Sequence, residues 1–364
     1  MTDTRTGKRA DGADGREVIG MNNSDKYLME RIMRGAFHNA LPGSVLSIVP
    51  ISGLGMVNRV FRVTCSNVEL ILRMRESTEA LQEFCKEAWC MREAKRIGIP
   101  SPEALAAGLE GETAYLIETS ISGTNGSLLP ALRTPLWEAL GRMARLIERF
   151  PATGFGLEFD ADAEQDSSIA SNSDSGSISC LNPIPGRGRF RNSFTPTWDA
   201  HIRYNLDALC DGDRLLGLGV YLPHQAESIR DAFSCLLAGF ETGRLRLGLL
   251  HGDLSPRNVM VGTDETIHLI DWGCALVHAV PHYGLACLLR SRLEDGSVSE
   301  TDEASFRAGY GLDVDAYEAM VRDIQCIALL DAFDKLRWAL DRSPGDVPAF
   351  RRFATRMAAS ACHK

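Results

Sequence analysis

The hydrophobic positions in the first third of the chain follow two different periods. Apolar residues recur at helical spacing over residues 25–38 and again over 78–97, where a glycine and two prolines follow the second run. Between these segments lie two β-rich runs, within residues 47–75, that a Ser-Asn turn separates. A short apolar run follows at 114–122. The pattern therefore predicts a hairpin between two helices and then a short buried strand.

Beyond residue 123 the pattern is mostly helical. Apolar residues recur at helical spacing over 136–147, 198–209 and 224–240, and this period dominates from residue 303 to the end. The exception is the segment 247–273, in which two short strands flank a turn. The second half of the chain is therefore predicted to be helical around one small hairpin.

The chain, with 364 residues, suits two lobes better than one ordinary domain. We predict an α+β fold with a small antiparallel-sheet lobe and one main helix over residues 23–118. A larger, mostly helical lobe is predicted over 119–364. Residues 1–22 and a Ser-, Asp- and Gly-rich stretch at about 160–188 are too polar to bury much surface, so we predict a disordered tail and a disordered insertion.

Composition narrows the functional classes. The net charge of -9 argues against a nucleic-acid partner, because there is no basic excess to neutralise phosphates. The ten cysteines include no CxxC pair and no zinc-ligand spacing. The chain shows no signal peptide and no apolar run of membrane-spanning length, which predicts a cytoplasmic protein without a membrane partner.

Candidate catalytic residues gather in the segment LGLLHGDLSPRNVMVGTDETIHLIDWG, which is predicted to be a β-hairpin with acids at both ends. Phosphoryl transfer needs a base that deprotonates the acceptor hydroxyl and oxygen ligands for Mg²⁺. Asp253 fits the base, and Asn258 and Asp271 fit the metal pair. We expect His251 to brace the loop through hydrogen bonds, with a direct catalytic role as the alternative. For the whole set, the alternative is that these residues only cap turns.

The motifs HGDLSPRN and LIDWG resemble those of the aminoglycoside phosphotransferase and choline kinase superfamily. This resemblance implies a bilobal protein-kinase-like fold, with ATP and Mg²⁺ as cofactors and GTP as a possible replacement for ATP. Protein kinases typically carry Arg at the position of Gly252 and Phe at that of Trp272, so small-molecule kinases are favoured. Family members often place an Asp where this chain has Gly284, which puts the geometry of the loop in question.

The same resemblance assigns nucleotide-binding residues in the small lobe. Gly53 and Gly55 would let a turn approach the phosphates, although an ordinary β-turn is the alternative. Arg73 stands at the position of the phosphate-binding lysine, and Glu87 on the following helix is its expected partner. The alternatives are a surface arginine and a solvated acid.

The segment AYLIETSISG resembles the family's hinge between lobes. There, backbone groups around residues 117–119 would bind the adenine edge, and Glu118 and Thr119 are its expected neighbours.

These assignments predict a phosphotransferase that moves the γ-phosphate of ATP to a hydroxyl of a small molecule. An aminoglycoside-like antibiotic is one candidate acceptor, and an amino alcohol or a sugar is the alternative. A catalytically weak nucleotide-binding pseudokinase remains the alternative from another class. Trp338 is expected in the core, or alternatively in a substrate pocket. Acids that are expected on a solvated face, or alternatively against ammonium groups, are Glu294, Asp295, Glu300, Asp302, Glu303, Asp313 and Asp315.

Overall fold

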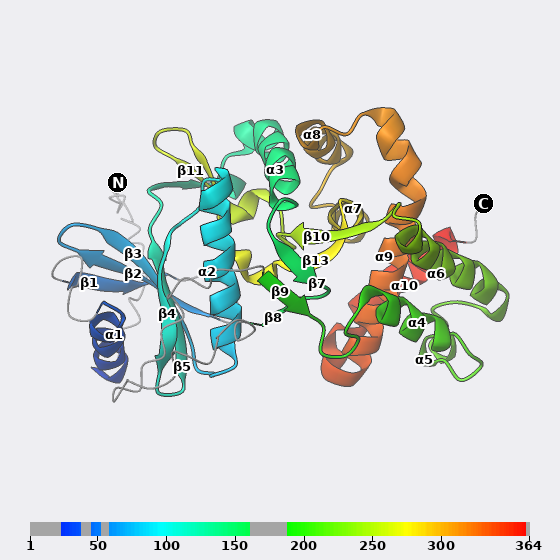
Figure 1. Cartoon of the computed structure of the whole chain (residues 1–364), viewed down its shortest axis with the longest axis horizontal. Coiled ribbons are helices and arrows are strands. Elements are labelled where there is room, and N and C mark those ends of the chain that lie inside the picture. The colour runs from blue at the N-terminus through cyan, green and yellow to red at the C-terminus, as the bar shows by residue number, and fades with distance from the viewer. Residues whose placement is uncertain (1–22, 38–44, 52–57, 161–187, 362–364) are drawn as a thin grey trace, which may run out of the picture.

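The computed structural model describes residues 23–37, 45–51, 58–160 and 188–361. It contains an N-terminal part built on an antiparallel sheet and a C-terminal part built mostly from helices (Figure 1). The predicted tail at 1–22, and the predicted insertion except for its two end residues, lie outside the described residues. The chain leaves the first sheet after residue 119, but the division into lobes at 118 stays a prediction.

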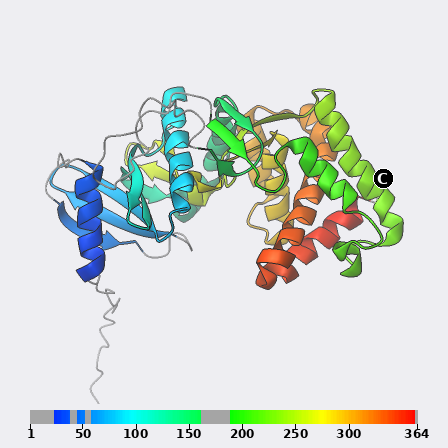
Figure 2. The same ribbon diagram turned by 60° about the horizontal axis from the view of Figure 1, so that its bottom comes forward.

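The N-terminal sheet has five strands in the order β1-β2-β3-β5-β4, and all neighbours are antiparallel. Its strands are β1 Val45–Pro50, β2 Arg59–Cys65, β3 Glu69–Arg75, β4 Ala104–Glu110 and β5 Thr113–Thr119. Helix α1 (Asn23–Ala36) covers one face and helix α2 (Ala80–Ile97) lies along the other (Figures 1 and 2). The predicted hairpin is thus β2–β3, and strands β1 and β4 extend the sheet on either side.

The alternation along β3 explains why two helices are needed. Leu70, Leu72 and Met74 are fully buried and pack against α1, whereas Arg73 points to the opposite face, toward α2. The side of α2 away from the sheet continues into the C-terminal core, where Trp89 contacts three phenylalanine rings. Helix α2 therefore joins the sheet to the rest of the molecule.

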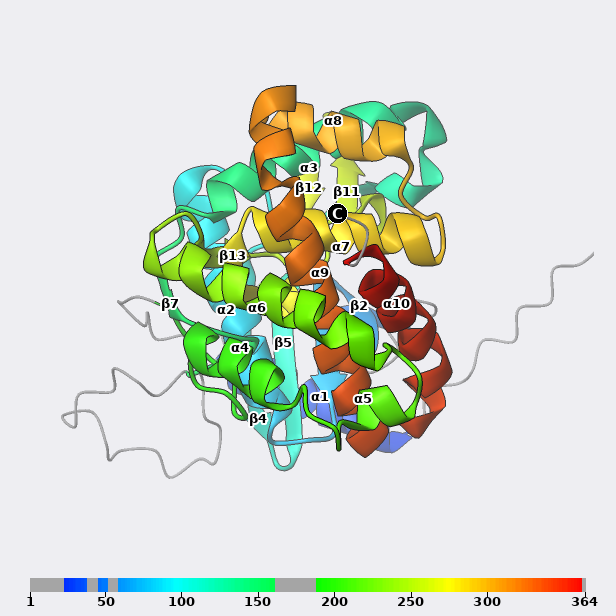
Figure 3. The same ribbon diagram turned by 90° about the vertical axis from the view of Figure 1, so that its right-hand side faces the viewer.

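The C-terminal part places helices around three small sheets. Helices α6 and α10 each pack against α9, and α3 packs against α8 (Figure 3). The helices are α3 Arg133–Ile147, α4 Trp198–Asp207, α5 Arg214–Gly217, α6 Ala226–Glu241, α7 His282–Glu294, α8 Glu300–Tyr310, α9 Val314–Arg342 and α10 Val347–Ser360. The predicted helical segments in this part are therefore present.

The three small sheets support the loops between these helices. One sheet pairs β10 with β13, one has the order β12-β11-β6, and one has the order β7-β9-β8. The strands are β6 Gly123–Asn125, β7 Ala152–Gly154, β8 Glu158–Phe159, β9 Gly188–Arg191, β10 Arg246–Leu250, β11 Val259–Gly262, β12 Ile267–Leu269 and β13 Leu276–Val280. The predicted catalytic hairpin is β11–β12, with its turn after Gly262.

One core prediction in this part was wrong. Trp338 is 52% exposed and does not line the main pocket, because it lies on the outer face of α9. It follows the buried Phe333 by five residues and the buried Leu336 by two, and both offsets turn the side chain to the opposite side of a helix.

None of the helices that the structure describes is long and apolar enough to span a membrane.

Candidate active site

The candidate catalytic loop connects β10 to β11 and depends on a glycine at its start. Gly252 adopts a φ of +82°, and a Cβ there would lie 1.9 Å from the backbone oxygen of Cys274. A larger residue is therefore excluded on both backbone and steric grounds. This accounts for the departure from the arginine that protein kinases typically carry at this position.

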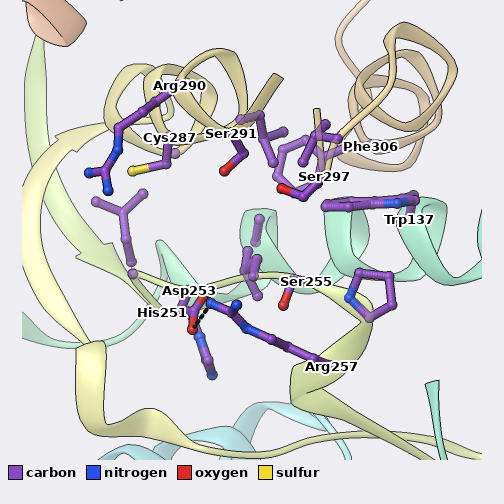
Figure 4. Close-up of a pocket in the computed structure, with 18 of the residues that line it drawn as sticks. Trp137, His251, Asp253, Ser255, Arg257, Cys287, Arg290, Ser291, Ser297 and Phe306 are labelled. Carbon is purple, nitrogen blue, oxygen red and sulfur yellow. Dashed lines mark hydrogen bonds and ion pairs between the residues drawn. The ribbon is translucent and has the colours of Figure 1, made fainter. Parts of the chain in front are cut away.

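Asp253 follows this glycine and is held from two sides. Arg257, four residues later, donates from Nη2 to both carboxylate oxygens of Asp253 at 2.8 Å. The Nδ2 of Asn258 donates to the backbone oxygen of Asp253 at 2.7 Å. The Asp253 side chain lines the main pocket, as Figure 4 shows. Sequence reasoning did not single out Arg257, although it lies within the motif HGDLSPRN.

Asn258 and Asp271 are brought together by the β11–β12 hairpin. The backbone N–H of Ile270 donates to the backbone oxygen of Asn258 at 3.0 Å. Asp271 follows directly after this contact. Asp271 has a φ of +62°, in the left-handed region, and 54% of its side chain is exposed. Asp271 thus has an accessible carboxylate, while the neighbouring Asn258 is buried.

His251 has the bracing position that the sequence predicted. Its side chain is fully buried, and its Nε2 lies 3.1 Å from the backbone oxygen of Ile270. Its ring also contacts the ring of Trp272, at 4.8 Å between centroids. Burial lowers the pKa of His251, so the neutral imidazole is favoured. The contact ties the start of the loop to the strand that precedes Asp271.

Trp272 fills the core beneath the loop. It is fully buried, its ring stacks on Phe150 with centroids 5.8 Å apart, and its Nε1 donates to the Ser101 hydroxyl at 3.1 Å. The hydroxyl of Ser101 in turn donates to the backbone oxygen of Leu269 at 2.9 Å. A tryptophan after the candidate metal ligand therefore packs the hairpin against the segment that follows α2.

On the sheet side of the site, Arg73 lies among carboxylates. The predicted ion pair with Glu87 on α2 is present, and Arg73 Nη2 lies 3.6 Å from Asp271 Oδ1. The Glu118 carboxyl is buried and also interacts electrostatically with Arg73. Burial, opposed by Arg73, raises the pKa of Glu118 to about 7. The arginine thus links β3, α2 and the end of the catalytic hairpin.

Lys86, the neighbour of Glu87, makes a second link that sequence reasoning missed. Its ammonium group is buried and donates to the backbone oxygens of Gly273 at 2.7 Å and Leu157 at 3.1 Å. Burial lowers the pKa of Lys86. The helix that holds Glu87 is therefore also fixed to the backbone just after Asp271. A lysine on a helix carries no sequence signal that would reveal such a contact.

Backbone groups at two places were also predicted to contact the nucleotide. Gly53 and Gly55 lie outside the described residues. Thr119 already accepts a hydrogen bond at Oγ1 from the backbone N–H of Glu103 at 2.9 Å. Strand β5 is paired with β3 and β4 up to Thr119, and the backbone N–H of Ser120 donates to the backbone oxygen of Glu69. The backbone groups of residues 117–119, which were expected to bind adenine, therefore form hydrogen bonds within the sheet. Backbone groups that are free to bind adenine would have to lie after Ser120.

The main pocket lies on the side of Asp253 away from the sheet and has a volume of about 500 Å³. Its walls come from the catalytic loop, α3, α7 and α8 (Figure 4). Gly284, at the position where an Asp was expected, lines this pocket in the first turn of α7. The loop is instead braced by His251 and by the contacts of Asp253 with its neighbours.

Comparisons with known proteins agree with this arrangement. The family model of the phosphotransferase enzyme family matches residues 47–320. Aminoglycoside phosphotransferase APH(4)-Ia is 17% identical with a TM-score of 0.58, over 92% of this chain and 99% of that chain. A putative fructosamine-3-kinase from Haemophilus somnus 129PT is 11% identical with a TM-score of 0.53, over 91% and 97% of the two chains. Choline kinase LicA from Streptococcus pneumoniae is 15% identical with a TM-score of 0.51, over 91% and 99%.

A search of curated proteins found no significant match. The similarity to solved structures confirms the predicted α+β, protein-kinase-like fold. The resemblance predicted from HGDLSPRN and LIDWG is confirmed by the family model, which spans about three quarters of the sequence. The chain therefore belongs to the phosphotransferase enzyme family.

Proposed function

We propose that this protein is an ATP- and Mg²⁺-dependent kinase that phosphorylates a hydroxyl group of a small molecule. The observation that carries the proposal is the position of Asp253, which faces a pocket of about 500 Å³ on one side. On its other side, through Asn258, it is joined to the segment that holds Asp271. An acceptor site and a phosphate site would thus meet at one carboxylate.

The chemical step assigns a distinct task to Asp253. Its carboxylate accepts the proton of the acceptor hydroxyl as the hydroxyl oxygen bonds to the γ-phosphorus. The bond from that phosphorus to the β–γ bridging oxygen breaks, and the electron pair leaves with ADP. Arg257 orients the carboxylate through its two hydrogen bonds at 2.8 Å. His251 acts by bracing the loop.

The residues at the β11–β12 hairpin fit a magnesium ion that is shared with phosphates. The part of the chain that the structure describes has no group of three His, Cys, Asp or Glu side chains suited to a metal. One carboxylate and one amide suffice where the nucleotide supplies other oxygens, as is usual for Mg²⁺. Because Asn258 donates through Nδ2, its amide oxygen is the atom that can bind a cation. When bound, Mg²⁺ would offset the negative charge of the β- and γ-phosphates.

Arg73 is the proposed phosphate-binding residue, and Glu87 is its positioning partner. The guanidinium lies near Asp271, on the side where the phosphates would meet the metal. An arginine keeps the positive charge of the usual lysine and offers a planar fork to phosphate oxygens. A crystal structure of APH(4)-Ia with AMP-PNP and hygromycin B supports a site for two substrates in this fold. ATP and GTP are both candidate phosphate donors for this site.

The metal assignment is tested by replacing Asp271 with Asn and measuring ATP and GTP affinity with and without Mg²⁺. In the wild-type protein, Mg²⁺ is expected to tighten nucleotide binding, and in the variant this effect is lost because one ligand is uncharged. Asp264→Asn, in the exposed turn of the same hairpin, serves as the control. Retention of the full Mg²⁺ effect in Asp271→Asn would remove Asp271 from the metal site.

A further inference from the structure

The carboxylates that line the pocket of the proposed acceptor site are largely neutralised by arginines. Four carboxylates line this pocket, and three of them form an ion pair with an arginine. The pairs are Glu148–Arg246, Asp253–Arg257 and Glu294–Arg290. The fourth, Asp295, accepts a hydrogen bond from the backbone N–H of Ser297 at 2.8 Å, and its hydrogen bonds with Ser297 lower its pKa.

Arg290 makes the pair that matters most for acceptor choice. Its Nε donates to Glu294 at 2.7 Å, and its Nη1 lies 3.7 Å from Asp331. Both Arg290 and Glu294 line the pocket on the wall formed by α7, opposite Asp253 (Figure 4 shows Arg290). A positively charged group that approaches Glu294 therefore meets the guanidinium as well.

Asp302 and Glu303, two further acids that the sequence offered as ammonium-binding groups, are also paired with arginines. Arg133, which lines the pocket, donates to both carboxylate oxygens of Asp302, at 2.8 and 2.7 Å. Asp302 and Glu303 are buried, and Glu303 pairs with Arg292 at 3.2 Å outside the pocket. Of the acids that the sequence offered as ammonium-binding groups, only Glu294 and Asp295 line the pocket, and Glu294 is already paired with Arg290.

The uncharged side chains that line the pocket include apolar and aromatic residues as well as four serines. Trp137 of α3 and Phe306 of α8 meet edge to face, with ring centroids 6.5 Å apart, at one end of the pocket. Leu254, Leu288 and Val298 also line it. A pocket of this volume and lining suits a drug-sized molecule that carries both apolar and neutral polar groups. Several ammonium groups would have to be desolvated there without free carboxylates to pair with, which is costly.

We propose that this site takes a hydroxylated acceptor with at most one positive charge, and that Arg290 excludes polycationic acceptors by occupying Glu294. This inference rests on the proposed kinase function, because it assigns the pocket beside Asp253 to the acceptor. Asp295 is the one carboxylate left for a single amine. The acceptor class therefore differs from that of a polyamine sugar.

The test is equilibrium binding to the full chain with Mg·ADP, which needs no turnover. Three probes of similar mass are compared: an uncharged polycyclic alcohol, its mono-amino analogue, and an aminocyclitol sugar with four amines. The first two are expected to bind at least about tenfold more tightly than the third, which corresponds to about 1.4 kcal/mol. Tighter binding of the four-amine probe, or no binding by any probe, would overturn the acceptor class.

Arg290→Gln sharpens the test, because it should weaken the preference against the four-amine probe. Freeing Glu294 is expected to raise affinity for the four-amine probe by up to about fivefold, since a carboxylate that is 26% exposed gains a cationic partner. Lys335 still pairs with Asp331 at 3.0 Å, so the fold keeps a partner for that acid. Arg292→Gln is the matched control, because Arg292 lies on the same helix and is equally exposed, at 29%, but is outside the pocket. An unchanged preference in Arg290→Gln would refute its role.

The two proposals fail in different ways. If the uncharged probe binds but no acceptor is phosphorylated, the kinase function falls and the selectivity of the pocket stands. If a four-amine sugar is both bound and phosphorylated best, the kinase function stands and the proposed acceptor class is wrong.

Discussion

At the scale of single residues, the site places charged groups of opposite sign on either side of the catalytic hairpin. Asp253 is held by Arg257 on the proposed acceptor side, and Arg73 is held among carboxylates on the proposed nucleotide side. Of those carboxylates, Glu118 differs because one of its oxygens, Oε2, is buried without a hydrogen-bond partner among the described residues. Such a group is costly to ionise.

The raised pKa of Glu118 predicts a pH-dependent stability. Its ordinary pKa is 4.5 and the folded value is about 7, so between these values the unfolded chain loses this proton while the folded chain keeps it. Stability from this group is therefore fully present below pH 4.5 and is lost as pH rises to about 7. Replacing Glu118 with Gln should remove the loss, which amounts to a relative gain at pH 8 on the order of 3 kcal/mol.

This difference is measured by chemical denaturation of wild type and Glu118→Gln at pH 5 and pH 8. Glu103→Gln is the control, since Glu103 lies just before the neighbouring strand and its side chain is 53% exposed. The control is expected to change stability little at either pH. Equal effects of Glu118→Gln at both pH values would contradict the raised pKa.

At the scale of elements, the catalytic loop depends on close contact between two backbone segments. Gly252→Ala should cost roughly 2–5 kcal/mol, from the positive φ and from the clash with Cys274. Gly243→Ala is the matched control, because Gly243 has a φ of +73° and a Cβ there would meet no described atom within 4 Å. It should cost only about 1–2 kcal/mol. Melting temperatures compare the two, and equal losses would mean that the loop tolerates a side chain.

The sequence predicted the elements whose local pattern agrees with the fold. The catalytic hairpin is an example, since its motif, its turn and its strand period all indicate the same structure. Strand β4, with the sequence ALAAGLE, was not predicted because alanines carry no strand preference, and only pairing with β5 and cover from α2 make it a strand. Trp338 was misplaced because hydrophobicity alone does not give the face of a helix.

The candidate site was predicted in part for the same reason. The carboxylates and amide of the motif could be named from spacing, and the Arg73–Glu87 pair from strand alternation and helix position. Lys86 could not, because its contact with Gly273 joins residues that are 187 positions apart. Arg290 could not, because its place in the pocket wall depends on how α7 packs beside the distant candidate catalytic loop. The selectivity role of Arg290 remains a proposal, as do the catalytic, binding and metal roles of the motif residues.

At the scale of the whole molecule, α2 connects the sheet to the helical part at the point where chemistry is proposed. Glu87 holds Arg73, and Lys86 holds the backbone after Asp271. Trp89, just along the same helix, packs into the C-terminal core. Three nearly consecutive residues of α2 therefore link the proposed nucleotide side to the C-terminal core. Movement of α2 would displace the proposed phosphate and metal sites together.

We propose that Asp253 is the base that activates an acceptor hydroxyl, between the proposed nucleotide side and the proposed acceptor side. The most direct measurement is acceptor-dependent release of ADP by wild type, Asp253→Ala and Asp199→Ala. Asp199 is the control because it also pairs with an arginine four residues later at 2.8 Å, on a helix outside the pocket. We expect Asp253→Ala to lose at least about a hundredfold in turnover while it still binds Mg·ATP, and Asp199→Ala to stay near wild type. Wild-type turnover by Asp253→Ala would show that Asp253 is not the base.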